Sequence, residues 1–387
     1  MSDSLVERVR ERLANESSRI RPADVAAAIR AESGGIMGDS EVLTNLRLLE
    51  TELQGAGILE PLLRADGVTD VLVAAPNSVW VDDGSGLARS AVTFADESSV
   101  RRLAQRLALA AGRRLDEAQP WVDGRLPGIG RDGLTVRLHA VLPPVASAGT
   151  CLSLRVLRPA TQDLASLSAA STIDRVALQL IADIVEARLA FVVSGGTGAG
   201  KTTLLAAILG AVGASERIVC IEDAPELAPV HPHFVRLVAR AANVEGVGEI
   251  TLRQLVRQSL RMRPDRIVLG EVRGAEVVDL LTALNTGHDG GAGTVHANSP
   301  AEVPARMEAL AALGGLDRTA LHSQLAAAIQ VVFHMCRTRG GARRLTEIGL
   351  IGTAGEAVQV LPVWHVERGF EPGAEALRRL LDERLPR

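Results

Sequence analysis

The residues most able to do chemistry form the stretch SGGTGAGKTT, from Ser194 to Thr203. The chain holds 42 lysines and arginines, and Lys201 in this stretch is the single lysine among them. The stretch contains the pattern Gly-x4-Gly-Lys-Thr between an apolar run typical of a strand and an Ala/Leu-rich run typical of a helix. This context predicts a P-loop, in which backbone N–H groups surround the phosphates of a nucleotide at a helix N-terminus.

Each residue type in the predicted P-loop has a chemical role. Glycines permit backbone conformations that are closed to other residues. The ammonium of Lys201 reaches between the β- and γ-phosphates, where the planar fork of arginine would not fit, and this explains the lone lysine. Thr202 offers a hydroxyl to Mg²⁺, so we expect ATP and Mg²⁺ as ligands. The expected nucleotide-binding residues of the loop are Gly195, Gly196, Thr197, Gly198, Ala199, Gly200, Lys201, Thr202 and Thr203.

Carboxylates follow two later apolar runs that have the pattern of strands. Glu222 and Asp223 follow in RIVCIEDAPE, and Glu271 follows in RIVLGEVRG. A carboxylate at the C-terminal end of a strand in an open α/β sheet lies where such folds bind ligands. We expect these carboxylates to position the attacking water and to bind Mg²⁺. The expected Mg²⁺ ligands, mostly through water, are Thr202, Glu271 and Asp223. Solvated acids at strand ends are the alternative.

Two of the eight histidines lie eight residues apart: His288 in NTGHDGGAG and His296 in GTVHANS. They could be metal ligands, structural histidines, or hydrogen-bonding groups that sense the γ-phosphate. With no cysteine cluster nearby and no HExxH pattern, zinc is not expected. The neighbouring P-loop and carboxylates favour the γ-phosphate sensor.

The elements that must position these side chains alternate between helix and strand along residues 174–387. Such alternation predicts a largely parallel sheet covered by helices, an α/β domain. Residues 57–157 read instead as short β-branched runs with one amphipathic helix, which predicts a small α+β domain. Residues 1–56 keep apolar spacings typical of helices, and 158–173, rich in Ser, Thr and Ala, has the composition of a linker.

Composition argues against several classes of protein. The net charge of −4 and the 2% aromatic content provide neither a basic surface nor a stacking platform, so nucleic acid is not expected as a partner. No apolar run approaches the roughly 20 residues of a membrane span. The polar start MSDSLVERVRERL does not resemble a signal peptide, so we expect a cytoplasmic protein.

Four motifs occur in the order GGTGAGKTT, IEDAPEL, RPDRIVLGEVRGAE and TGHDGGAGTVHANS. They resemble the Walker A, Asp box, Walker B and His box of the secretion-superfamily ATPases, the hexameric motors of type II and type IV secretion and of type IV and tight-adherence (Flp) pilus assembly. The stretches AGRRLDEAQPWVDGRLP and VRLHAVLPP resemble the N-terminal domain of the tight-adherence branch. Three scattered cysteines cannot form the four-cysteine zinc insert of other branches, which favours the tight-adherence branch or the cytosolic ring ATPases of type IV secretion.

The resemblance implies a PAS-like N-terminal domain followed by a RecA-like motor domain. It also implies a homo-hexamer that meets an integral platform protein at the cytoplasmic face of the inner membrane. By position, Glu222 would orient or deprotonate the attacking water and Glu271 would hold Mg²⁺ through water, although these roles could be exchanged. His296, and as a second candidate His288, would contact the γ-phosphate or relay its loss.

Several arginines are candidates for charge stabilisation. Arg155 in LSLRVL stands where the family's N-terminal domain brings an arginine towards the phosphates. The next position usually holds a second basic residue in the family, but this chain has Val156 there. Within a chain or across a subunit boundary, the resemblance favours Arg240 and Arg261. Arg236 and Arg257 are further candidates. A structural or solvated arginine is the alternative for each.

Three kinds of function fit a P-loop here: a hydrolysing motor, another P-loop enzyme, and a scaffold that binds ATP without turnover. The motor is favoured, and a nucleic-acid translocating or conjugative-transfer ATPase is the alternative. A GTPase would need a second lysine for its NKxD motif, and an ABC protein would need an LSGGQ-like signature. A scaffold that binds ATP without turnover would not need both strand-end glutamates.

Overall fold

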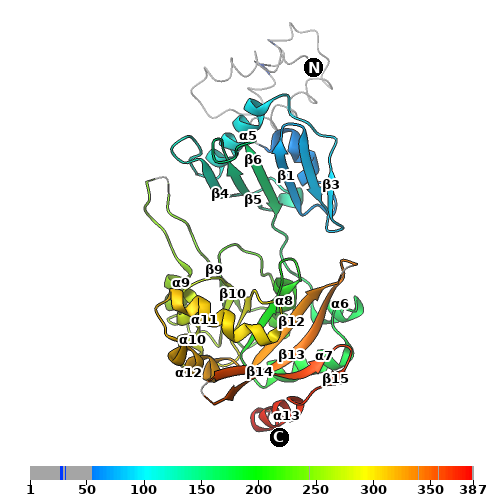
Figure 1. Cartoon of the computed structure of the whole chain (residues 1–387), viewed down its shortest axis with the longest axis vertical. Helices are drawn as coiled ribbons and strands as arrows, with labels where there is room; N and C mark the ends of the chain where they lie inside the picture. Colours follow the sequence, from blue (N-terminus) through cyan, green and yellow to red (C-terminus); the bar gives the residue numbers. More distant parts are fainter. Residues whose placement is uncertain are drawn as a thin grey trace. The chain divides into compact units, whose positions relative to one another are not determined.

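The chain divides into two compact units, Met1–Arg158 and Pro159–Arg387 (Figure 1). The predicted helical segment 1–56 lies almost wholly outside the described residues. The computed structural model describes residues 27–28, 31, 55–243, 245–338, 340–355 and 357–385.

The first unit is an antiparallel six-stranded sheet in the order β3-β2-β1-β6-β5-β4. Asp96 caps the N-terminus of helix α5 (Glu97–Ala110), since its side chain accepts a hydrogen bond from the Ser99 amide. The helix buries Val100 and Leu107 in the unit's core. This arrangement confirms the predicted α+β domain. The other elements are η1 (Gly57–Leu59), α4 (Glu60–Leu63), β1 (Asp70–Ala75), β2 (Ser78–Asp82), β3 (Leu87–Arg89), β4 (Trp121–Leu126), η2 (Arg131–Gly133), β5 (Val136–Val141) and β6 (Cys151–Val156).

The second unit is a nine-stranded sheet in the order β15-β14-β13-β12-β7-β11-β10-β8-β9. The strands from β12 to β9 in this order are parallel, and β13, β14 and β15 are antiparallel to their neighbours. The strands are β7 (Phe191–Gly195), β8 (Ile218–Glu222), β9 (Phe234–Val238), β10 (Arg266–Val272), β11 (Ala292–Val295), β12 (Val331–Arg337), β13 (Arg343–Ala354), β14 (Ala357–His365) and β15 (Gly369–Phe370). The helices are α6 (Leu164–Ala169), α7 (Arg175–Glu186), α8 (Lys201–Gly210), α9 (Leu252–Ser259), α10 (Glu276–Leu284), η3 (Pro300–Glu302), α11 (Val303–Leu313), α12 (Arg318–Ala328) and α13 (Ala374–Arg384).

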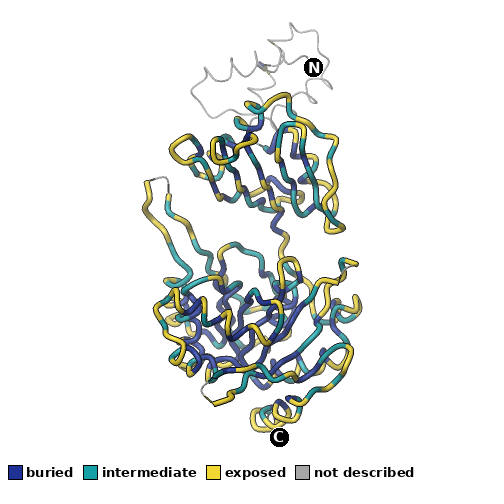
Figure 2. Tube along the Cα trace, viewed as in Figure 1, coloured by how far each residue is buried: buried dark blue, intermediate teal, exposed yellow. Residues whose placement is uncertain are grey.

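Both faces of this sheet are buried at the central strands β7 and β8, where every residue is buried and most are apolar (Figure 2). Strand β7 shows the pattern: Phe191 and Val193 pack into a core shared with α7, α8 and α13. Val192, between them, packs into a second core shared with α10, α11 and α12. The alternation places β7 at the centre of the unit and confirms the predicted α/β fold.

Residues 158–173 are mostly not a linker, and the prediction is corrected here. From Pro159 onward they belong to the second unit. Helix α6 begins at Asp163, which accepts a hydrogen bond from the Ser166 amide, and Leu167 is only 4% exposed within the core. A six-residue helix is too short to show a clear 3.6-residue period, so its sequence resembled a loop.

The described part of the chain contains no helix with the length and apolar character that crossing a membrane requires.

Candidate nucleotide-binding site

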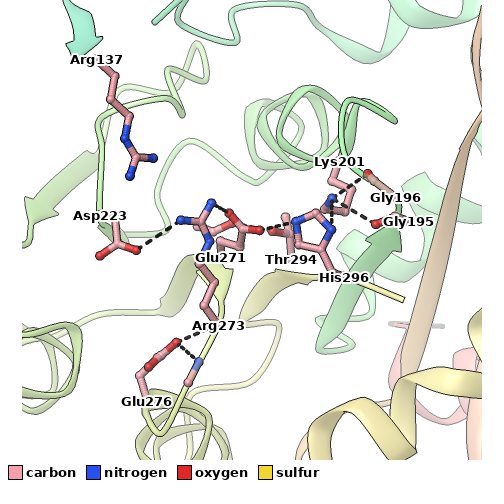
Figure 3. Close-up of polar contacts among 12 residues, drawn as sticks. Arg137, Gly195, Gly196, Lys201, Asp223, Glu271, Arg273, Glu276, Thr294 and His296 are labelled. Atoms are coloured by element: carbon pink, nitrogen blue, oxygen red, sulfur yellow. Dashed lines mark hydrogen bonds and ion pairs between the residues drawn. The ribbon is translucent and has the colours of Figure 1, made fainter. Parts of the chain in front are cut away.

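The P-loop connects the end of β7 at Gly195 to the start of α8 at Lys201 (Figure 3). Gly195, Gly198 and Gly200 have φ angles of 146°, 70° and 95°, a region that favours glycine. A Cβ on Gly195 would also lie 2.3 Å from the carbonyl oxygen of Met335 in the neighbouring strand. Both the backbone conformation and the close approach therefore require the glycines that define the motif.

Lys201 lies deep in this loop, with 7% of the residue exposed. Its Nζ donates to the carbonyl oxygens of Gly195 (3.1 Å) and Gly196 (2.9 Å), and it lies 3.5 Å from Nδ1 of His296. Burial lowers the pKa of Lys201, whereas the Glu271 carboxylate acts in the opposite direction. A partly desolvated ammonium beside the backbone of a glycine loop is suited to binding phosphate oxygens.

His296 joins the P-loop lysine to a strand-end carboxylate (Figure 3). Its Nε2 lies 2.6 Å from Oε1 of Glu271, which belongs to β10. Burial lowers the pKa of His296, and the Lys201 ammonium lowers it further. Both effects favour a neutral ring, in which Nε2 faces the Glu271 carboxylate and Nδ1 faces the Lys201 ammonium. Three predicted site residues thus form one chain of polar contacts.

Glu222, at the end of β8, lies beside this chain of contacts. Its Oε1 accepts hydrogen bonds from the amides of Leu227 (2.9 Å) and Glu226 (3.1 Å), and its Oε2 lies 3.2 Å from Nε of Arg236. Burial raises the pKa of Glu222 to about 7, although the two amides and Arg236 oppose the shift. A Cβ on Gly270, the residue before Glu271, would lie 2.7 Å from Cγ of Glu222. The two glutamates therefore belong to one region of the sheet edge but have different partners.

The buried carboxyl of Glu222 predicts a pH-dependent stability. The pKa in the folded chain, about 7, exceeds the ordinary value of 4.5, so between these pH values the folded state keeps a proton that the unfolded state loses. Stability should therefore fall as pH rises through this window, by up to about 3 kcal/mol for this group. Glu222→Gln cannot ionise and should lose this part of the pH dependence. Melting temperatures of both proteins at pH 5 and pH 8 test this, and identical pH dependences would contradict it.

Arg273 is a site residue that the sequence reasoning missed. Its guanidinium pairs with Oε2 of Glu271 and lies 4.0 Å from Oδ2 of Asp223. Glu276 fixes the turn, since its Oε1 accepts from the amides of Arg273 and Gly274, both at 2.7 Å. The signal was present in Glu-Val-Arg, because alternate residues along an extended segment point to the same side.

Mg²⁺ fits the donors at this site. Thr202 follows Lys201 in the first turn of α8, and Glu271 and Asp223 supply carboxylate oxygens near Arg273. Within the described ranges, no group of three or more His, Cys, Asp or Glu side chains could by itself hold a metal ion. Mg²⁺ usually keeps several waters and binds one or two protein oxygens together with substrate phosphates, so a sparse set of donors is what it needs.

His288 does not lie with the other site residues, and the prediction that it senses the γ-phosphate is corrected. It precedes β11, whereas His296 follows β11, and β11 runs parallel to β7. The two histidines therefore lie at opposite edges of the sheet, and the P-loop is at the edge of His296. The Nδ1 of His288 lies 3.0 Å from the carbonyl oxygen of Ala283 in the last turn of α10, which gives His288 a helix-terminal role.

Arg155 belongs to the first unit, on β6. Its Nε donates to Oδ1 of Asp70 at 2.8 Å, and 58% of its side chain is exposed. Arg137 on β5 is its direct partner in the sheet register, and Nε of Arg137 donates to Asp123 at 3.1 Å. The sequence alone does not single out Arg137, because the strand register that places it opposite Arg155 is not visible there.

The other candidate arginines fall into two groups. Arg236 and Arg257 are held by carboxylates: Arg236 by Glu222, and Arg257 by Asp279 at 2.8 Å. Arg240 and Arg261 are exposed, and their guanidinium groups donate to the carbonyl oxygens of Gly248 (2.9 Å) and Arg257 (3.2 Å). A backbone carbonyl does not neutralise an arginine, so the second group keeps its charge available to a ligand or another chain.

The sequence is similar to proteins named for secretion systems and for conjugal transfer. The family described as Type II/IV secretion system protein matches residues 52–354. A relative from Mycobacterium tuberculosis strain H37Rv, named "Putative conjugal transfer protein", is 74% identical over 349 residues, which cover 90% of this chain and 99% of that protein. The type IV secretion system protein PtlH of Bordetella pertussis is 32% identical over 265 residues, which cover 62% of this chain and 76% of PtlH.

Solved structures share the fold. The pilus retraction motor PilT, solved with bound ADP, matches with a TM-score of 0.52 and 21% identity over 75% of this chain and 81% of PilT. The Legionella pneumophila ATPase DotB matches with a TM-score of 0.50 and 17% identity over 89% of this chain and 88% of DotB. Because the family match spans most of both units and the four motifs, the chain belongs to the family of Type II/IV secretion system proteins.

Proposed function

We propose that this protein hydrolyses Mg-ATP and works as a ring-forming motor for protein secretion or for assembly of a tight-adherence (Flp-type) pilus. The observation that carries the proposal is the line of contacts from Lys201 through His296 to Glu271 beside a glycine loop. It unites a phosphate-binding cation with a carboxylate at the carboxyl ends of parallel strands, where α/β sheets bind ligands.

The site's own residues suggest how ATP is cleaved. The loop amides and Lys201 hold the β- and γ-phosphates, and Thr202 with Glu271 holds Mg²⁺, with Asp223 in support. Bound Mg²⁺ neutralises charge that develops on the phosphate oxygens. Glu222 takes the proton of the attacking water, a task for which its pKa of about 7 is well matched. If Glu271 is the base instead, the pH dependence of turnover should survive in Glu222→Gln.

His296 is the residue through which the γ-phosphate is sensed. Its ring lies between the ammonium of Lys201 and the carboxylate of Glu271. A phosphate that recruits Lys201 changes the charge facing Nδ1, and the loss of that phosphate restores it. The histidine can thereby report the nucleotide state to β10 and β11, the strands that carry these residues.

The partners follow from the family and from exposed charge. We propose a homo-hexamer, a PAS-like first domain, and an integral platform protein at the cytoplasmic face of the inner membrane. Arg240 and Arg261 are exposed and have no carboxylate among their described hydrogen-bond partners, which suits contacts with nucleotide or with a neighbouring subunit. Arg155 is proposed to act on the phosphates from the first domain, as the family resemblance implies.

Conjugative transfer is a second candidate function, since the relative at 74% identity carries that name. In such a role the protein could drive assembly of a transfer channel, or it could move DNA directly. Direct movement of DNA predicts binding to single-stranded DNA that weakens steeply with salt. The net charge of −4 favours assembly of a transfer channel.

The test of the proposed function is steady-state phosphate release from Mg-ATP across a range of protein concentrations. An active site completed by neighbouring subunits should give a specific activity that rises with concentration and then levels off. A specific activity that is constant over the whole range would contradict a subunit-assembled motor.

A further inference from the structure

The hairpin formed by β12 and β13 brings two arginines to the P-loop, and none of the family motifs contains them. Strand β12 is parallel to β7 and ends at Arg337, so its carboxyl end lies at the edge of the sheet where the P-loop leaves β7. Strand β13 returns antiparallel from Arg343, which is the register partner of Arg337. Both arginines are exposed.

Arg343 contacts the phosphate loop directly. Its Nε donates to the carbonyl oxygen of Gly198 at 3.0 Å. Its Cδ lies 3.2 Å from the position that a Cβ on Gly200 would occupy, so the side-chain stem packs along the last turn of the loop. The terminal nitrogen Nη1 of Arg337 lies 3.9 Å from the position that a Cβ on Gly198 would occupy. The guanidinium of Arg343 offers five N–H donors, and the bond to Gly198 uses one of them.

The strand order gives the nucleotide a direction. Glu271 belongs to β10 and His296 directly follows β11; both strands lie on one side of β7, and Lys201 contacts His296 there. Since the P-loop lysine reaches the β- and γ-phosphates, the γ-phosphate points towards β11 and β10. The opposite end of the nucleotide must then leave the loop on the other side of β7, where β12 and β13 lie.

We propose that Arg343, supported by Arg337, binds the α-phosphate end of the nucleotide, the part that ATP and ADP share. The planar fork of arginine suits a phosphate group, and its hold on Gly198 fixes the fork beside the loop. The inference rests on the proposed function, because it presumes a nucleotide in the P-loop. It assigns Arg343 to retention of both nucleotides and leaves discrimination between them to Glu271 and His296.

Titrations of MgADP and of the Mg complex of a non-hydrolysable ATP analogue test the proposal. Arg343→Gln should weaken both ligands by the same factor, about tenfold or more, because it removes charge-assisted hydrogen bonds made to both. At saturation, kcat should stay within about threefold of wild type while KM rises, since the lost contact is equal in ground and transition states. Arg344→Gln is the matched control: Arg344 is also exposed and adjacent, and successive strand residues face opposite sides.

The outcomes separate this inference from the proposed function. Wild-type protein that binds neither ligand would defeat the proposed function itself. If wild type binds but Arg343→Gln binds MgADP equally well, or loses only the ATP analogue, the inference about Arg343 is wrong. If Arg343→Gln melts at a lower temperature without nucleotide, Arg343→Lys distinguishes lost phosphate binding from lost stability, because the lysine keeps a cation near the loop. Partial recovery of MgADP affinity supports the proposal, and recovered melting temperature without recovered affinity overturns it.

Discussion

Replacing Lys201 by arginine should reduce kcat/KM for Mg-ATP by about 10²- to 10³-fold, even though the positive charge is kept. Lys201 is buried, and its Nζ reaches the carbonyl oxygens of both Gly195 and Gly196. A planar guanidinium is wider than an ammonium and would have to displace these groups or His296. Phosphate release measured over a range of ATP concentrations gives the effect.

An arginine-to-lysine exchange elsewhere is the control for the Lys201→Arg result. Arg379 pairs with Glu375 on α13, and both side chains are largely exposed. Such exposed pairs contribute little to stability, so Arg379→Lys should leave turnover and stability nearly unchanged. If Lys201→Arg also turned over ATP like wild type, the explanation for the single lysine of the chain would be wrong.

Replacing Glu271 by glutamine should lower kcat by about 10²- to 10³-fold while the affinity for MgADP stays within about threefold. The substitution keeps the shape of the side chain but removes the charge that faces His296 and Arg273. That charge holds His296, the proposed γ-phosphate sensor, and contributes to binding of Mg²⁺. Its loss should therefore destabilise the transition state more than it weakens the binding of MgADP. Single-turnover phosphate release and a MgADP titration measure the two quantities separately.

Glu308→Gln is the control for Glu271→Gln. Glu308 belongs to α11 and lies 3.5 Å from both Arg318 and His322, away from the P-loop contacts. Its substitution should leave kcat unchanged. A Glu271→Gln protein with wild-type kcat would remove Glu271 from the reaction, and a large loss of MgADP affinity would give it a role in binding.

The sequence alone predicts the parts of the site that depend on short-range pattern. The P-loop is visible because its glycines, its lysine and the flanking strand and helix are contiguous. Glu271 is visible because it directly follows four apolar residues of β10. The two domains are also predictable, because one has short strands around a single helix and the other alternates helix and strand.

Other features depend on tertiary placement and could not be predicted. His288 and His296 look equivalent in sequence, yet strand β11 between them carries them to opposite edges of the sheet. Arg343 lies 145 residues from Gly198 along the chain, and only the pairing of β12 with β7 brings the two together. Long-range pairing and register have no signature in a single sequence.

The most direct test of the central claim is phosphate release from Mg-ATP by the wild-type protein, measured beside Lys201→Ala at the same concentrations. The account predicts Mg²⁺-dependent release by wild type and release at background level by the variant. Equal release by both proteins, or no release by wild-type protein that demonstrably binds ATP, would contradict the claim that this P-loop is the site of hydrolysis.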